Sequence, residues 1–315
     1  MPRVLITGAS GFVGGWLARE WHESGAEVLG ISRRAESPAG AAEAVDLLND
    51  AAVEAAVRKF QPDFVCHLAA LASTGRSWQQ PSRCVGDNQA MTWNLLEAVR
   101  QHASNATVLI AGSGEGYGVP QQLPVSESHR LAPGTPYAIA KTATDLIGGL
   151  YADAHGLNVV RARAFNHAGP GQGGSFLVGS ICSQAAEQLT ANPGTPITVR
   201  TGAAEVRRDY CDVRDVARAY RLLCEAGEPG IWNVCSGSST STSEVVALLE
   251  EAVAPAQLVH QVDPAFVRPH ETLDICGDPA KLAAATGWKP LIQLSQTVAD
   301  TLAAARSASI GSTTA

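Results

Sequence analysis

The chain has 315 residues, of which 45% are hydrophobic and 17% charged, which is the size and composition of an ordinary globular protein with a large core. Its net charge is −7 and its arginines are scattered, which excludes a general basic face for nucleic acid. No stretch reaches the length of a membrane-spanning helix and the start "MPRVLITGAS" lacks the features of a signal peptide, so we expect a cytoplasmic protein with no membrane partner.

Apolar runs that read as strands alternate with helical periodicity through the first half of the chain. We expect strands at 3–7, 27–32, 64–70, 107–113 and 158–165, and helices near 12–24, 51–60, 84–102 and 137–155. Continuous apolar strands separated by helices predict a parallel sheet covered on both faces, with a ligand crevice at the carboxyl ends of the strands.

The pattern loosens after Phe165. The glycine-rich "GPGQGGS" is followed by expected helices at 176–190, 213–226, 243–254 and 295–306 and strands at 197–199 and 231–236. The predicted fold is α/β, a Rossmann-type doubly wound parallel sheet with a smaller C-terminal α/β substrate lobe. We assign residues 1–165, completed by elements near 209–236, to the doubly wound domain with the ligand crevice, 166–208 and 237–305 to the substrate lobe, and 306–315 to a flexible tail.

Three glycines follow the first strand in "TGASGFVG". Gly8, Gly11 and Gly14 have the spacing G-x-x-G-x-x-G at the start of a helix, where a diphosphate can approach the exposed N–H groups. The sequence therefore predicts a dinucleotide site whose turn also includes Ser10, Phe12 and Val13.

The second strand ends in Ser32, Arg33 and Arg34, where an NAD-specific fold usually has an acidic residue. Two guanidinium groups suit a 2′-phosphate, so the predicted cofactor is NADP(H) rather than NAD(H); the alternative is a solvated pair of arginines. The fold also places five residues beside the cofactor, two of them flanking the adenine: Asp46, Leu47, Leu68, Ala69 and Ala70.

Tyr137 and Lys141 lie at i and i+4 in "TPYAIAK", on one face of an expected helix that starts at Pro136. A nearby ammonium group lowers the pKa of a phenol, so we expect Lys141 to lower the pKa of Tyr137 and make it a proton donor or acceptor. An amphipathic surface pair is the alternative.

The motifs "TGASGFVG", Ser113 and "YAIAK" together resemble the extended short-chain dehydrogenase/reductase family, and the similarity covers nearly the whole chain. Within that family, "GSGEGYG", "RARAFNHAGPGQ", "VRRDYCDVRDVARAY" and "VRPHETLDICGDPAKL" are similar to the GDP-mannose branch, most closely to the GDP-4-keto-6-deoxy-D-mannose reductases.

The resemblance implies roles for the catalytic candidates. Ser113 would bind the sugar carbonyl, Tyr137 would supply a proton as hydride reaches C4, and Lys141 would bind the nicotinamide ribose. Glu115 matches the acid/base carboxylate of GDP-mannose 4,6-dehydratases, whereas in a reductase it would bind or orient sugar hydroxyls, and both interpretations stay open.

The substrate implied by the resemblance is a nucleotide sugar, which the protein would recognise by its phosphates and its base. Arg207 or Arg208, together with Arg268, are the candidate phosphate ligands. Further candidate substrate residues are Asn166, Val178 and Glu271, the last facing guanine or its ribose. The resemblance also implies a homodimer built on the two helices at 84–102 and 137–155.

Metal chemistry is not predicted. His67 and His167 have no ligand partner nearby in sequence, and seven dispersed cysteines are expected to be reduced, structural thiols.

The predicted activity is NADPH-dependent reduction of the C4 ketone of a GDP-linked 4-keto-6-deoxy sugar. Dehydratases typically read "FNHESPRRG" where this chain reads "FNHAGPGQG", and the chain lacks their extra segments. The alternatives are a GDP-mannose 4,6-dehydratase, a nucleotide-sugar epimerase and a non-catalytic NADP(H)-binding sensor, while the nucleotide base and the C4 configuration stay open.

Overall fold

The computed structural model describes residues 1–72, 74–192, 194–267 and 272–313. A seven-stranded sheet in the order β10-β6-β5-β4-β1-β2-β3 dominates it, and all neighbouring strands are parallel. The strands are β1 (Arg3–Thr7), β2 (Glu27–Ser32), β3 (Ala41–Ala44), β4 (Phe64–His67), β5 (Thr107–Ala111), β6 (Asn158–Ala164) and β10 (Gly230–Val234). The predicted fold class is confirmed, and the strand order reverses between β1 and β4, where such folds hold their ligands.

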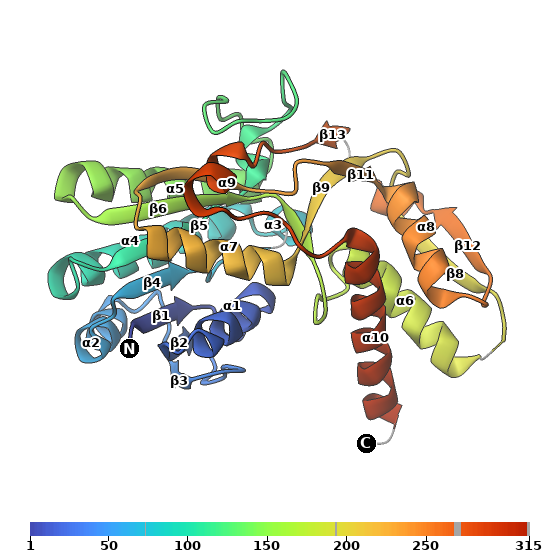
Figure 1. The fold of residues 1–315 in the computed structure, drawn as a ribbon, viewed down its shortest axis with the longest axis horizontal. Coiled ribbons are helices and arrows are strands. Elements are labelled where there is room, and N and C mark those ends of the chain that lie inside the picture. The colour runs from blue at the N-terminus through green and yellow to red at the C-terminus, as the bar shows by residue number, and fades with distance from the viewer. Residues whose placement is uncertain (73, 193, 268–271, 314–315) are drawn as a thin grey trace.

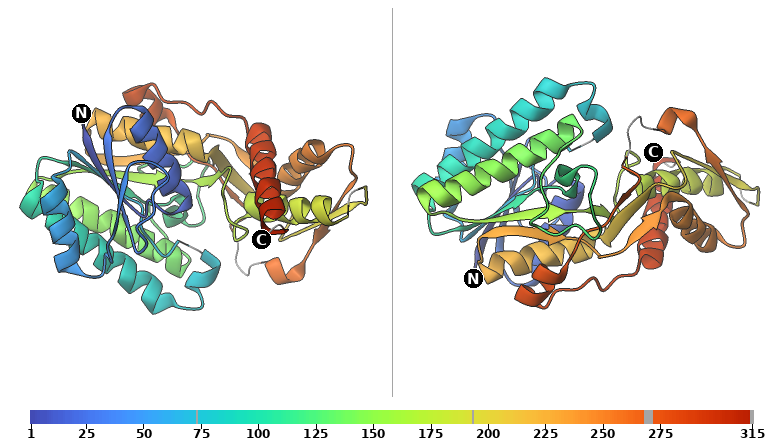
Figure 2. Two further views of the ribbon diagram at one scale, coloured as in Figure 1. Left: turned by 90° about the horizontal axis from the view of Figure 1, so that it is seen from below. Right: turned by 90° about the horizontal axis from the view of Figure 1, so that it is seen from above.

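Helices cover both faces of this sheet (Figure 2). Side chains alternate along each strand, so Val4 and Ile6 pack with α1 (Phe12–Glu23), α7 (Val213–Ala226) and α9 (Ala280–Thr286). Leu5 points to the opposite face, which is covered by α2 (Asp50–Phe60), α4 (Pro81–His102) and α5 (Pro136–His155). The first core is therefore two apolar layers separated by one sheet.

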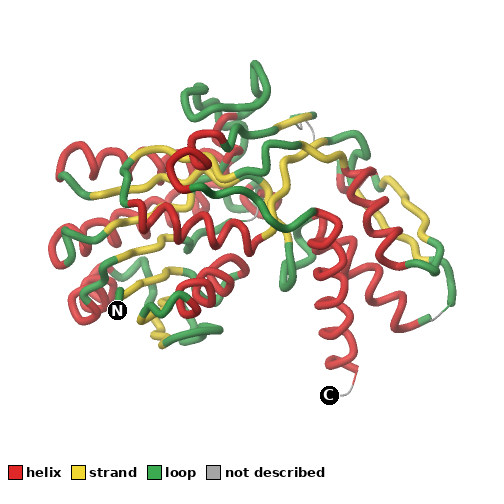
Figure 3. The backbone as a smooth tube through the Cα atoms, in the orientation of Figure 1, coloured by secondary structure: helices red, strands yellow, loops and turns green. Residues whose placement is uncertain are grey.

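A second lobe lies beside the carboxyl ends of the sheet (Figure 1). It contains two small sheets, one of β7 (Asn166–Ala168), β9 (Arg207–Asp212), β11 (Ser239–Ser241) and β13 (Asp274–Ile275), the other of β8 (Ile197–Thr201) and β12 (Leu258–Val262). The helices α6 (Leu177–Ala191), α8 (Thr242–Val253) and α10 (Leu294–Thr313) enclose its apolar core. Three short helices, α3 (Thr74–Ser77), η1 (Gly114–Tyr117) and η2 (Pro264–Phe266), lie in connections that are otherwise loops (Figure 3).

Several predicted boundaries differ from the observed ones. The strands expected at 64–70 and 107–113 end at His67 and Ala111, because the chain then turns into the small and glycine-rich residues that line a cleft. Among the elements near 209–236, β10 pairs in the first sheet and α7 packs on it, whereas β9 pairs within the second lobe; α9, farther along the chain, also packs on the first core.

In the described part of the predicted tail at 306–315, α10 continues to Thr313. The hydroxyls of Ser307 and Ser309 donate to the carbonyls of Ala303 and Ala305, 3.1 and 3.0 Å away, so these serines bond within the helix instead of ending it.

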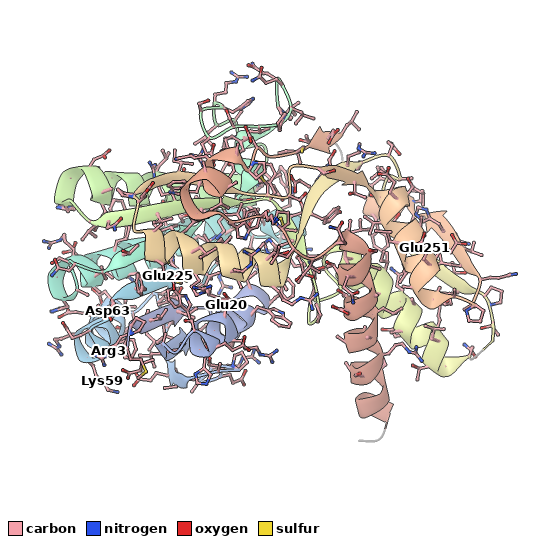
Figure 4. All side chains as sticks on the ribbon, in the orientation of Figure 1. Arg3, Glu20, Lys59, Asp63, Glu225 and Glu251 are labelled. Atoms are coloured by element: carbon pink, nitrogen blue, oxygen red, sulfur yellow. The ribbon has the colours of Figure 1, made fainter. Side chains whose placement is uncertain are left out.

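Ion pairs tie the helices of one face together. Figure 4 labels Glu20 on α1 and Glu225 on α7, and the guanidinium of Arg221 binds both carboxylates at 2.8 and 2.7 Å. None of the helices in the described part of the chain combines the length and the apolarity that crossing a bilayer requires.

Candidate active site

A cleft of about 810 Å³ opens at the carboxyl ends of β1, β2, β4, β5 and β6, and residues of the second lobe form its other side. We call it the large cleft. It brings together all predicted cofactor and catalytic residues and two further predicted substrate residues, namely Gly8, Ser10, Gly11, Phe12, Val13, Gly14, Ser32, Arg33, Arg34, Asp46, Leu47, Leu68, Ala69, Ala70, Ser113, Glu115, Tyr137, Lys141, Asn166 and Arg208.

The glycine turn between β1 and α1 has no room for side chains. Gly8 has a φ of +73°, and a Cβ there would lie 2.9 Å from the backbone nitrogen of Ala69. A Cβ on Gly14 would lie 2.1 Å from the carbonyl oxygen of Gly8. The N-cap of α1 is Gly11, which offers no side-chain cap, so the helix N-terminus faces the large cleft without a competing acceptor of its own.

The arginines after β2 lie at one end of the large cleft. Arg34 forms an ion pair with Glu36 at 3.4 Å, but both side chains are mostly exposed, so the pair holds the guanidinium only weakly. A helix N-terminus for a diphosphate and two accessible guanidinium groups for a 2′-phosphate fit a dinucleotide of the NADP(H) type.

Two neighbouring elements supply the catalytic candidates. Ser113 is the N-cap of η1, and its hydroxyl accepts a hydrogen bond from the backbone N–H of Glu115 at 3.2 Å. Tyr137 lies in the first turn of α5, whose N-cap Thr135 accepts from the N–H of Ala138 at 3.0 Å. The Ser113 hydroxyl lies close enough to the Tyr137 phenol to influence its pKa, so a carbonyl oxygen that reaches one hydroxyl is also near the other.

Lys141 follows Tyr137 by one helical turn and is almost fully buried. Its ammonium group donates to the carbonyl oxygen of Ala111, at the end of β5, over 2.6 Å. Burial lowers the pKa of Lys141 to about 8. The lysine thereby links α5 to the strand from which η1 begins.

The expected lowering of the Tyr137 pKa is wrong for this structure. Burial raises the pKa of Tyr137, and the negative charge of Glu115 raises it further, while the nearby Ser113 hydroxyl works in the opposite direction. Lys141 is directed to the Ala111 carbonyl instead, so spacing on the helix did not determine which charge the phenol experiences. Tyr137 is therefore protonated at neutral pH and able to donate.

Glu115 lies in η1 between two glycines whose neighbours leave no space. A Cβ on Gly114 would lie 3.1 Å from the Phe165 ring, and one on Gly116 would lie 2.9 Å from the hydroxyl of Thr142. These glycines allow η1 to pack against both α5 and Phe165, the residue after β6, which keeps Glu115 at the wall of the large cleft.

The predicted substrate residues of the second lobe divide into three groups. Arg208 lines the large cleft, whereas Arg207 is directed away from it and pairs with Glu244 at 3.0 Å. Val178 is also not at the cleft, because it is buried in the apolar core of the second lobe. Arg268 and Glu271 lie outside the described residues.

Arg207 and Arg208 separate because β9 is a strand. Successive side chains of a strand point to opposite faces, so only one of the two arginines can face the cleft. Arg208 is held there by donating to the carbonyls of Arg207 and Thr272 at 2.8 and 2.7 Å.

The large cleft includes residues that sequence reasoning missed. They come from α4, the loop between the lobes, α7 and β13, and are Arg83, Asp87, Met91, Gln172, Phe176, Tyr220 and Ile275. Only the i, i+4 pair Arg83 and Asp87, joined at 3.0 Å, has a pattern in sequence; the others are brought in by tertiary packing.

The two histidines near the cleft have hydrogen-bonding partners. The ring nitrogens of His67 lie 2.9 Å from the Thr7 hydroxyl and 3.0 Å from the Thr92 hydroxyl, and burial lowers the pKa of His67 to about 3. His167 contacts the carbonyl oxygen of Phe165 at 3.1 Å. Within the described ranges no group of three histidine, cysteine or acidic side chains is arranged to hold a metal ion.

Comparison with known proteins places this cleft among nucleotide-sugar enzymes. A family model described as GDP-mannose 4,6 dehydratase matches residues 5–301. The GDP-6-deoxy-D-mannose reductase of Pseudomonas aeruginosa is 35% identical over 240 residues, which are 75% of this chain and 78% of the relative.

Solved structures show the same fold over the whole chain. The structure of RMD from Pseudomonas aeruginosa complexed with NADPH has a TM-score of 0.85 and 31% identity, and covers 98% of this chain and 100% of that one. The UDP-glucose 4-epimerase of Thermus thermophilus in complex with NAD has a TM-score of 0.86 and 31% identity, and covers 97% and 99% of the two chains.

Proposed function

Because the chain belongs to the family described as GDP-mannose 4,6 dehydratase, within the extended short-chain dehydrogenases/reductases, we propose that it is an NADPH-dependent nucleotide-sugar reductase. Its proposed substrate is GDP-4-keto-6-deoxy-D-mannose, and its product is GDP-6-deoxy-D-mannose (GDP-D-rhamnose) or the C4 epimer. The observation that carries the proposal is the pair of neighbouring hydroxyls of Ser113 and Tyr137, with a protonated phenol, in a cleft that also contains the glycine turn and Arg33.

The cofactor site supports NADPH over NADH. The N-terminus of α1 would bind the diphosphate, and Arg33 and Arg34 would bind the 2′-phosphate. The related RMD structure contains NADPH, whereas the related epimerase contains NAD.

In the proposed reaction the ketone at C4 is reduced to an alcohol. Bound NADPH supplies a hydride, which is two electrons and a proton, to C4. Ser113 orients the carbonyl oxygen, and Tyr137 gives that oxygen its proton as the C=O double bond becomes a single bond. Lys141 would bind the nicotinamide ribose, and solvent reprotonates the phenolate left on Tyr137 before the next turnover.

The direct test is to mix protein, NADPH and GDP-4-keto-6-deoxy-D-mannose and follow nicotinamide absorbance. We expect one NADPH consumed per 6-deoxyhexose formed, and identification of that sugar gives the C4 configuration. Tyr137→Phe should lose about 10²-fold or more in kcat while still binding NADPH, since the proton donor is removed. A variant with the wild-type rate would exclude Tyr137 as the donor.

Glu115 supports a second candidate function, a GDP-mannose 4,6-dehydratase. Its carboxylate lies close enough to Tyr137 to raise the pKa of the phenol, so a base and an acid face the same part of the large cleft. Conversion of GDP-mannose to a 4-keto sugar without net NADPH loss, abolished in Glu115→Gln, would establish the dehydratase. An epimerase would instead interconvert two GDP-hexoses, and a non-catalytic sensor would bind NADPH without turnover of either substrate.

We also propose a cytoplasmic homodimer formed by α4 and α5. These helices lie side by side on the outer face of the first lobe (Figure 2), and large apolar side chains are exposed on them: Trp93, Ile139, Leu146 and Leu150. All seven cysteines are buried free thiols, which supports a reducing compartment.

A further inference from the structure

A network of buried, hydrogen-bonded polar side chains begins at Tyr117, the last residue of η1. The hydroxyl of Tyr117 donates to the side-chain oxygen of Asn233 at 2.7 Å and accepts from the guanidinium of Arg163 at 3.1 Å. The same guanidinium binds the Asp145 carboxylate at 2.5 Å. Tyr117 and Asn233 have no exposed surface, and Arg163 and Asp145 are nearly as buried.

This hydrogen-bond network connects the two elements that carry the catalytic candidates. Tyr117 ends η1, two residues after Glu115, while Asp145 lies on α5, one turn after Lys141. Arg163 on β6 joins them, and its guanidinium carbon lies 5.0 Å from the centre of the Tyr117 ring.

At its other end, Asn233, the network reaches the loop between η1 and α5. The amide of Asn233 donates to the Val125 carbonyl at 2.8 Å, and its backbone N–H donates to Glu127 at 2.9 Å. Tyr117 therefore has strands, helix and loop arranged around one hydroxyl, with no surface through which water could replace a lost partner.

The ring of Tyr117 packs in a small apolar cluster with Phe165 and Ile275, which both line the large cleft. Apolar packing restricts where the ring lies, but it is not directional and allows small movements of the ring. The paired hydrogen bonds of the hydroxyl add direction, since the acceptor and the donor lie on different strands, β10 and β6.

We propose that Tyr117 is a positioning residue whose hydroxyl, held between Arg163 and Asn233, fixes η1 relative to α5 so that the Ser113 hydroxyl stays beside the Tyr137 phenol. This role rests on the proposed function, because it concerns the geometry of the same reduction. Tyr117 itself does not line the large cleft, so its effect on the reaction passes through Ser113 and Glu115.

The test compares two tyrosine variants that each lose one hydrogen-bonding hydroxyl. Tyr117→Phe keeps the ring and removes the bonds to Arg163 and Asn233. Tyr151→Phe is the matched control, because the Tyr151 ring is also buried on α5, its hydroxyl bonds Glu97 at 3.2 Å, and it lies outside the large cleft.

We expect Tyr117→Phe to lower kcat about tenfold while the KM for NADPH stays within about twofold, since a small displacement of reacting groups is costly. Tyr151→Phe should keep its kcat. In a Ser113→Ala background, Tyr117→Phe should cost less than about threefold, because the group that it positions is already absent. Equal kcat in Tyr117→Phe and Tyr151→Phe, or a full tenfold loss in both backgrounds, would overturn the proposal.

Hydrogen exchange of the backbone amides of 113–118 tests the same role without any substrate. These amides should exchange about tenfold faster in Tyr117→Phe than in wild type or Tyr151→Phe, since local opening becomes easier. Unchanged exchange would overturn the positioning role. A wild type that does not oxidise NADPH with the ketone would refute the proposed function alone, and the exchange result would still decide about Tyr117.

Discussion

A Cβ atom at position 114 would lie 3.1 Å from three atoms of the Phe165 ring, so even alanine forces the ring or η1 to move by a few tenths of an ångström. We expect Gly114→Ala to lower kcat about tenfold with unchanged NADPH affinity, because Ser113 is displaced from Tyr137. Steady-state kinetics and fluorescence titration with NADPH measure the two effects.

The compensating change distinguishes this clash from a general loss of stability. Phe165→Leu in the Gly114→Ala background should restore most of kcat, as the shorter side chain frees the space. Gly134→Ala is the matched control, since a Cβ there meets nothing within 4 Å. A double variant that is slower than Gly114→Ala would contradict the steric explanation.

The buried Lys141 should make the free energy of unfolding depend on pH. Its pKa is lowered from 10.5 to about 8 in the folded protein, so between these values the unfolded chain binds more protons and stability rises with pH. The penalty for burying the charge is complete below pH 8. Relative to Lys141→Met, the wild type should gain about 1.4 kcal/mol per pH unit between pH 8 and 10.

Denaturant unfolding of both proteins at pH 7, 8, 9 and 10 measures this difference. Other titrating groups are common to the two proteins and cancel. Parallel curves across the whole range would show that Lys141 has an ordinary pKa in the folded state.

At the scale of single residues, the sequence predicted the site well and its electrostatics poorly. Glycine spacing and the Tyr137–Lys141 pair identified residues that all line the large cleft. The pKa of Tyr137 was predicted in the wrong direction, because it depends on burial and on the distance to Glu115, and neither is encoded in the spacing along a helix.

At the scale of elements, apolar runs predicted the strands that are buried on both faces. β3 reads "AAEA" and β9 reads "RRDYCD", and neither has an apolar run, so both were missed. Because β9 was missed, the choice between Arg207 and Arg208 stayed open. The alternation of side chains along this strand is what distinguishes the two.

The two arginines that follow β2 should determine which cofactor the protein prefers. Arg33→Ala and Arg34→Ala should each weaken NADPH binding about tenfold and leave NADH binding unchanged, since only NADPH has a 2′-phosphate. Arg58→Ala on α2, which is not part of the large cleft, is the control. Titrations with both nucleotides measure this, and equal wild-type affinities for NADPH and NADH would exclude the 2′-phosphate site.

At the scale of the whole molecule, the exposed apolar face of α4 and α5 predicts a dimer. Light scattering at micromolar concentration should give the mass of two chains, and replacing Leu146 and Leu150 together by Glu should give one folded chain, because each buried leucine contributes about 2 kcal/mol. Leu291→Glu, at an equally exposed leucine elsewhere, should stay dimeric. A wild-type protein with the mass of one chain would reject the interface.

The order of the strands also constrains how the protein is made. β10 lies at the edge of the first sheet and pairs with β6, yet the chain builds β7, β8 and β9 of the second lobe in between. During translation the β6 edge therefore stays open until Val234 has left the ribosome, and an open edge invites pairing with another chain. A fragment ending at 165 would carry this edge permanently, because the strand that covers β6 begins at Gly230, 65 residues farther along the chain.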